Sequence, residues 1–113
     1  MRKFHHIGLP TTEPQEGEWY VEATKVWVTE PDDHPFLVEF LRYEDDSPVT
    51  GPLRELPHVC FETDDYKRDI EGCEVILGPF RPDDERTVVF VMKDGCVFEY
   101  MEYDAGMDRD ASE

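Results

Sequence analysis

The chain has 113 residues, with 28 acidic and 11 basic side chains and a formal net charge of −17 at pH 7. This length fits one compact domain, because two independent halves of about 50 residues each would barely be stable alone. The acidic balance argues against general binding to nucleic acids or to anionic membranes, since both require a basic surface. We therefore expect neither of these partners.

The cysteines Cys60, Cys73 and Cys96 are odd in number and have no CxxC spacing. This pattern predicts no disulfide framework and a reducing compartment. No apolar run follows the first three residues, and none approaches the length of a membrane span. We expect a cytoplasmic protein.

Segments rich in β-branched and aromatic residues predict most of the fold as strands. In chain order these segments are residues 4–9, 18–29, 36–44, 58–62, 73–77, 87–92 and 96–103. The second of them is long enough for two strands, so about eight strands are expected.

Proline, glycine and acidic residues separate these strands. Pro10 ends the first strand, and residues 11–17 show no helical periodicity. A connector at residues 46–56 has a short helical turn expected near its end. The only other predicted helix covers residues 65–71, after a Thr-Asp-Asp capping cluster.

The C-terminal strands and the tail have distinct signals. Lys93-Asp94-Gly95 joins the last two strands, and Asp-Gly is typical of a tight hairpin turn. Residues 104–113 are acidic and small, which predicts a disordered tail.

Two stretches of the chain repeat one pattern, in which a histidine-bearing strand comes first and an apolar strand with a central glutamate comes last. The first copy supplies His6 and Glu39, and the second supplies His58 and Glu99. Imidazole and carboxylate groups suit Zn²⁺, Ni²⁺, Co²⁺, Mn²⁺ or Fe²⁺. The four residues are therefore candidate ligands of one divalent metal ion.

Strand alternation puts each glutamate among large apolar side chains. Glu39 shares its face with Leu37 and Leu41, and Glu99 shares its face with Val97 and Met101. A buried carboxylate must be neutralised or paired, and a metal ion does this. The alternative interpretation places both glutamates on a solvated face, with the flanking residues in the core.

Four segments carry a resemblance to a known family. They are His6-Ile7-Gly8, Val38-Glu39-Phe40-Leu41 with Asp46-Ser47-Pro48 after it, the stretch from Pro57 to Asp65, and Gly95-Cys96-Val97-Phe98-Glu99. In this order they resemble the vicinal oxygen chelate superfamily of glyoxalases, bleomycin-resistance proteins and dioxygenases. The local similarity is greatest to methylmalonyl-CoA epimerases and glyoxalase I.

The resemblance implies an α+β fold of two tandem βαβββ-type modules that form an incomplete, mostly-β barrel around one metal ion. A single domain at 1–103 would contain module one at 4–45, the connector at 46–56 and module two at 57–103. The helix that family members carry between the first two strands is reduced or lost here. The implied metal ligands are His6, Glu39, His58 and Glu99, with His5 as the substitute for His6 if the register shifts by one.

The resemblance also implies a metal-dependent lyase or isomerase that enolises a small carbonyl or carboxylate substrate. Glu99 or Glu39 would act as the catalytic base, with Glu62 and Glu102 as weaker candidates. The alternatives are a non-enzymatic small-molecule-binding protein of the same fold and an extradiol-type dioxygenase. Strand edges that the lost helix leaves bare favour a homodimer.

Overall fold

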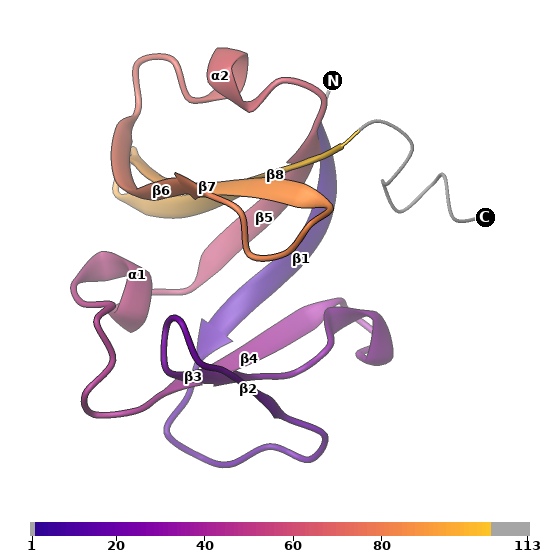
Figure 1. The fold of residues 1–113 in the computed structure, drawn as a ribbon, viewed down its shortest axis with the longest axis vertical. Coiled ribbons are helices and arrows are strands. Elements are labelled where there is room, and N and C mark those ends of the chain that lie inside the picture. Colours follow the sequence, from indigo (N-terminus) through magenta and orange to yellow (C-terminus); the bar gives the residue numbers. More distant parts are fainter. Residues whose placement is uncertain (1, 105–113) are drawn as a thin grey trace. The chain divides into compact units, whose positions relative to one another are not determined.

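A computed structural model describes residues 2–104, so residues 105–113 of the predicted disordered tail lie outside the described part. Residues 2–104 form eight strands, two short α-helices and one short 3₁₀ helix, and Figure 1 shows how these elements follow one another along the chain. The strands are β1 (Arg2–Pro10), β2 (Trp19–Val21), β3 (Val26–Val28), β4 (Val38–Tyr43), β5 (His58–Thr63), β6 (Glu74–Phe80), β7 (Arg86–Lys93) and β8 (Cys96–Tyr103). The helices are the 3₁₀ helix at Pro31–Asp33, α1 (Pro52–Glu55) and α2 (Tyr66–Asp69).

The expected mostly-β, α+β fold is confirmed, including the absence of a helix between β1 and β2. The short helical turn near residue 52 is confirmed as α1, while α2 is shorter than the helix predicted at 65–71. In residues 2–104, no helix has the length and apolar character needed to cross a membrane.

The chain divides into two compact units. The N-terminal unit is His6–Val59, and the described part of the C-terminal unit consists of residues 2–5 and 60–104. Strands β1 and β5 each contribute residues to both units.

The N-terminal unit is built on the strand order β2-β3-β4-β1. Strand β2 pairs with β3 and β3 pairs with β4, both antiparallel, whereas β1 and β4 are parallel. Val26, Val28 and Leu41 form the buried core of one sheet face, because β3 and β4 place Val28 opposite Leu41. Tyr43 packs against this core.

The segment after β4 is tied to the turn between β2 and β3. The Ser47 hydroxyl donates a hydrogen bond to the carbonyl oxygen of Thr24 at 2.5 Å, and Lys25 forms an ion pair with Asp46 at 2.7 Å. The Asp-Ser-Pro segment singled out in the sequence thus fixes the path of the chain as it leaves β4.

One sequence-based expectation about β4 is wrong. The strand begins at Val38, and Leu37 has a φ of 57°, a left-handed conformation that leucine rarely adopts. Strand alternation does not extend through such a residue. The prediction that Leu37 shares a strand face with Glu39 therefore does not hold. Leu37 is nevertheless held in place, since its carbonyl oxygen accepts a hydrogen bond from the Ile7 amide at 3.0 Å.

The C-terminal unit has the strand order β5-β8-β7-β6. Strands β7 and β8 pair antiparallel along their whole length, from Arg86 opposite Tyr103 to Lys93 opposite Cys96. The hairpin turn has positive φ at both Asp94 (54°) and Gly95 (79°), as the Asp-Gly signal predicts. Helix α2 lies beside β8 (Figure 1), and the Tyr66 amide at its start donates a hydrogen bond to the Glu102 carboxylate at 2.9 Å.

Candidate metal centre

The pairing of β1 with β4 places His6 and Glu39 on one sheet face. Gly8 lies directly opposite Glu39 in this parallel ladder, and His6 precedes Gly8 by two residues. Side chains two residues apart on a strand share a face, so the imidazole of His6 and the carboxylate of Glu39 project to the same side. The His6 Nε2 atom lies 3.4 Å from Glu39 Oε1.

The absence of a side chain at Gly8 makes room for His58. A Cβ atom placed on Gly8 would lie 2.1 Å from Cε1, 2.5 Å from Nε2 and 2.6 Å from Nδ1 of His58. The imidazole of His58 therefore covers the glycine backbone directly. Glycine inside a strand commonly marks such a close approach.

His6, Glu39 and His58 converge above this glycine. The imidazole rings of His6 and His58 meet edge to face, with centroids 5.7 Å apart and an interplanar angle of 78°. One potential ligand atom from each of the three residues lies within 4.8 Å of the other two. Both histidines are buried, whereas the Glu39 side chain keeps 19% of its surface exposed. The group is thus largely buried, and Glu39 is its most exposed member.

This donor set fits a divalent ion. Ligand atoms each about 2.1 Å from one ion are about 3.0 to 3.4 Å apart at neighbouring positions and about 4.2 Å apart across an octahedron. The 3.4 Å between His6 Nε2 and Glu39 Oε1 lies in the first range. Two imidazoles and one carboxylate suit Zn²⁺ and neighbouring transition metals.

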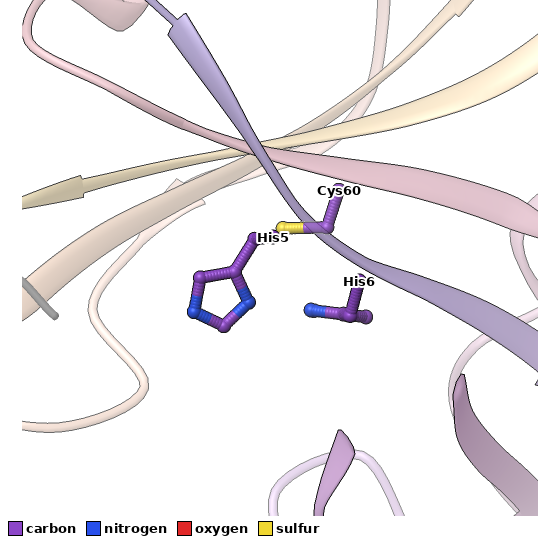
Figure 2. Close-up of side chains that lie close together, drawn as sticks. All are labelled: His5, His6 and Cys60. Carbon is purple, nitrogen blue, oxygen red and sulfur yellow. The ribbon is translucent and has the colours of Figure 1, made fainter. Parts of the chain in front are cut away.

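The two consecutive histidines of β1 have different surroundings. His6, not His5, lies with Glu39 and His58. His5 belongs to the C-terminal unit, where it is 6% exposed and its ring lies within 4.8 Å of the Cys60 thiol. Figure 2 shows the Cys60 sulfur beside the His5 side chain. The structure therefore favours His6 over His5 as the candidate ligand.

Glu99, the fourth predicted ligand, lies in β8 of the C-terminal unit. It is 7% exposed, and Val97 and Met101 on the same strand face are both 2% exposed. The alternative interpretation, in which Glu99 lies on a solvated face, is wrong for this residue. Burial lowers the pKa of the nearby Arg86 guanidinium, but neighbouring groups, Glu99 among them, leave that pKa above its ordinary value. Participation of Glu99 in the metal centre stays a prediction.

Sequence reasoning assigned no role in the site to two residues of the N-terminal unit, Gly8 and Arg54. A signal for Gly8 was present, because it is a glycine inside a strand segment that otherwise favours large side chains. Arg54 in α1 extends over the ring of Tyr43 at 5.6 Å and lines a hollow on the same unit. Its position depends on the fold of the connector, which no local pattern specified.

Comparisons with known proteins support the fold. No protein-family model matches the chain, and no curated protein matches it. The chain is similar in structure to a hypothetical protein from Bacillus halodurans C-125, with 16% sequence identity and a TM-score of 0.60 over 89% of this chain and 94% of the other. A glyoxalase family protein from Bacillus cereus matches with 17% identity and a TM-score of 0.40, over 69% of this chain and 59% of the other.

The two similarities differ in what they establish. At 16% identity the Bacillus halodurans match establishes a shared fold and nothing about chemistry. The Bacillus cereus match, with a TM-score of 0.40, is too weak to support a conclusion. The functional interpretation therefore depends on the residues of this chain.

Proposed function

We propose that this chain is a metal-dependent lyase or isomerase of the glyoxalase and epimerase kind, acting on a small carbonyl or carboxylate substrate. The observation that supports the proposal most directly is the convergence of His6, Glu39 and His58 above Gly8. The sequence resemblance implies the same three residues as ligands, with Glu99 as the fourth.

The proposed site is suited to removing a proton next to a carbonyl group. A divalent ion held by these residues would supply Lewis acidity toward the substrate oxygens. A carboxylate of the chain then takes the proton from the carbon alpha to the carbonyl and returns it to the same or the adjacent carbon. Glu39 is one candidate base, since 19% of its side chain is exposed while its Oε1 atom contacts His6. Glu99 is the other candidate that the sequence indicates.

Glu102 is a poorer candidate base. Its carboxylate accepts a hydrogen bond from the Tyr66 amide and thereby holds the start of α2. A residue with this structural role would have to release the helix in order to accept a proton.

Metal analysis of purified variants tests the proposal. We expect wild-type protein, reconstituted with Zn²⁺, Ni²⁺, Co²⁺, Mn²⁺ or Fe²⁺ in turn, to retain about one ion per chain after gel filtration. His6→Ala, Glu39→Ala and His58→Ala should each lose most of the ion while keeping the circular dichroism spectrum of the wild type. His34→Ala and Glu71→Ala are matched controls, because His34 lies in the turn before β4 and Glu71 is exposed after α2.

A second measurement distinguishes the enzyme from a binding protein of the same fold. The metal-loaded protein should catalyse exchange of the alpha proton of a small keto acid with deuterated solvent, and a chelator should abolish the exchange. Wild-type protein that retains none of the five metals would contradict the proposal and favour a metal-free binding protein. Retained metal with oxygen consumption in place of proton exchange would favour a dioxygenase.

A further inference from the structure

A hollow of about 430 Å³ lies in the N-terminal unit, beside the candidate metal centre. Its lining combines apolar side chains with several polar ones. The lining residues are Pro10, Thr11, Thr12, Leu41, Tyr43 and Arg54. None of them was part of the predicted ligand set.

The hollow and the metal centre occupy neighbouring positions on one sheet face. Gly8 pairs with Glu39, and two residues further along both strands Pro10 pairs with Leu41. This places Pro10 and Leu41 on the same face as His6, Gly8 and Glu39. Cα atoms two residues apart on a strand are about 7 Å apart. The Cα atom of Leu41, which lines the hollow, therefore lies about 7 Å from that of Glu39, and the Cα atom of Tyr43 lies about 13 Å from it.

Arg54 gives the rim of the hollow a positive charge. The guanidinium lies over the ring of Tyr43 at 5.6 Å. Leu53, the preceding residue, is 5% exposed and anchors the short helix α1 that carries Arg54. The burial of Leu53 and the contact with the Tyr43 ring together position the Arg54 side chain at the hollow.

The charge of Arg54 is not used in an ion pair within the described part of the chain. Among the arginines of residues 2–104, ion pairs to carboxylates are found at Arg42, Arg68, Arg81 and Arg86, and neither at Arg54 nor at Arg2. The positive charge of Arg54 is therefore available to an anionic ligand, even though the chain as a whole has a net charge of −17.

Two threonines complete the rim. The Thr11 amide donates a hydrogen bond to the Leu41 carbonyl oxygen at 2.8 Å, which fixes the loop at the end of β1 against β4. The Thr11 hydroxyl oxygen accepts a hydrogen bond from the Glu13 amide at 3.1 Å, so its hydrogen can still be donated. Thr12 adds a second hydroxyl group.

We propose that this hollow binds a carboxylate which the substrate carries apart from the oxygens that face the metal centre. This inference rests on the proposed function and specifies its substrate class: linear keto acids with a second carboxylate about 7 to 13 Å from the reacting carbonyl. A guanidinium with hydroxyl donors beside it matches one carboxylate in charge and geometry. A phosphate monoester would bring a charge of about −2 near pH 7, which one arginine in an acidic chain balances poorly.

Binding of two matched keto acids tests the inference. 2-Oxononanedioate has a distal carboxylate within this span when its chain is extended, and 2-oxononanoate has the same nine-carbon chain with a methyl group in its place. We expect Zn²⁺-loaded wild-type protein to bind 2-oxononanedioate about tenfold more tightly in calorimetry, since one charge-assisted hydrogen-bond pair supports a difference of that order. The preference should vanish in Arg54→Gln and persist in Arg81→Gln, whose arginine pairs with Asp104 and does not line the hollow.

The outcomes that contradict the inference are specific. Equal affinities for the two acids in the wild type would overturn it, and so would an unchanged preference in Arg54→Gln with a wild-type melting temperature. Arg54→Lys keeps the charge without the planar fork, and an intermediate preference supports the carboxylate assignment. Inorganic phosphate that displaces 2-oxononanedioate at equal concentration would overturn the choice of carboxylate over phosphate.

Failure of this inference can be told apart from failure of the proposed function. If the protein retains metal but shows no preference, the metal centre stands and the carboxylate site falls. If it retains no metal but prefers 2-oxononanedioate through Arg54, the carboxylate site stands and the proposed chemistry falls.

Discussion

Substitution of Gly8 by alanine gives the sharpest test of the candidate centre, because strand propensity and the structure predict opposite signs. Alanine is favoured over glycine in a strand interior by about 0.5 to 1 kcal/mol, and Gly8 does not have a positive φ. Propensity alone therefore predicts a more stable protein. The structure predicts the opposite result, because the added methyl group would overlap the imidazole of His58.

The size of the effect follows from the contact distances. The new Cβ would lie 2.1 Å from Cε1 of His58, whereas carbon atoms pack at about 3.5 Å or more, so the ring must move by at least about 1.4 Å. Forcing extra atoms into a packed site lowers the free energy of unfolding by about 1 to 3 kcal/mol. Metal–ligand distances tolerate deviations of about 0.2 Å, so the displaced imidazole cannot keep its position as a ligand.

Two assays measure these effects. Chemical denaturation of the metal-free protein should show the loss of 1 to 3 kcal/mol, about the amount estimated for overpacking. Competition with a chromophoric chelator should show at least a tenfold loss of Zn²⁺ affinity, in the range seen when groups that orient ligands are altered.

A double-mutant cycle with His58→Ala makes the test specific. With the imidazole removed, Gly8→Ala should be neutral or slightly stabilising, which gives a coupling free energy of about 1 kcal/mol or more. Equal destabilisation by Gly8→Ala in the two backgrounds would refute the assignment of His58 to the space above Gly8. A Gly8→Ala protein with wild-type Zn²⁺ affinity would refute the role of this glycine in the metal centre.

Three further predictions concern backbone conformation and charge. In urea denaturation, Leu37→Gly should leave the free energy of unfolding unchanged or raise it by up to about 1 kcal/mol, since glycine adopts the left-handed conformation without strain. A loss above about 2 kcal/mol would instead indicate that the leucine side chain contributes packing. Gly95→Ala should lower that free energy by about 1 kcal/mol, because φ is 79° there, and a neutral result would contradict the described hairpin turn. A hydrogen bond from Arg42 holds the pKa of Glu18 below its ordinary value, so this pair stabilises the fold at neutral pH and loses its contribution as the pH falls through the lowered pKa. The difference in unfolding free energy between wild type and Arg42→Gln should therefore be constant above about pH 5 and shrink in more acidic buffers, and a difference that grows on acidification would refute the pairing.

Much of the strand pattern was predictable because each strand carried a local signal. The hairpin of β7 and β8 is the clearest case, since β-branched and aromatic residues flank an Asp-Gly turn and the structure has both residues at positive φ. Strand alternation also grouped Glu99 with Val97 and Met101 on one face, but it left open whether that face or the opposite one is buried; the structure buries it. Such signals depend on residues within a few positions of each other.

Features that depend on contacts between distant residues were not predictable in this way. Leu37, whose backbone is left-handed, takes part in two backbone hydrogen bonds: its amide donates to the carbonyl oxygen of His34, and its carbonyl oxygen accepts from the amide of Ile7. The second bond joins segments 30 residues apart in the sequence. The choice between His5 and His6 required the register of β1 against β4, which neither strand encodes alone. Arg54 lines the hollow because of the way in which the proline-rich connector folds. The sequence of the connector predicted turns, but not the direction in which those turns take the chain.

The division of β1 between the two units limits how this chain can be taken apart. Residues 2–5 belong to the C-terminal unit and residues 6–10 to the other, and β5 divides in the same way after Val59. A gene cut within the connector would yield two polypeptides, each lacking residues of its own unit: the later piece would miss residues 2–5, and the earlier piece would miss His58. The repeat visible in the sequence is thus not a pair of autonomous building blocks, and engineering by fragment exchange must keep both copies on one polypeptide.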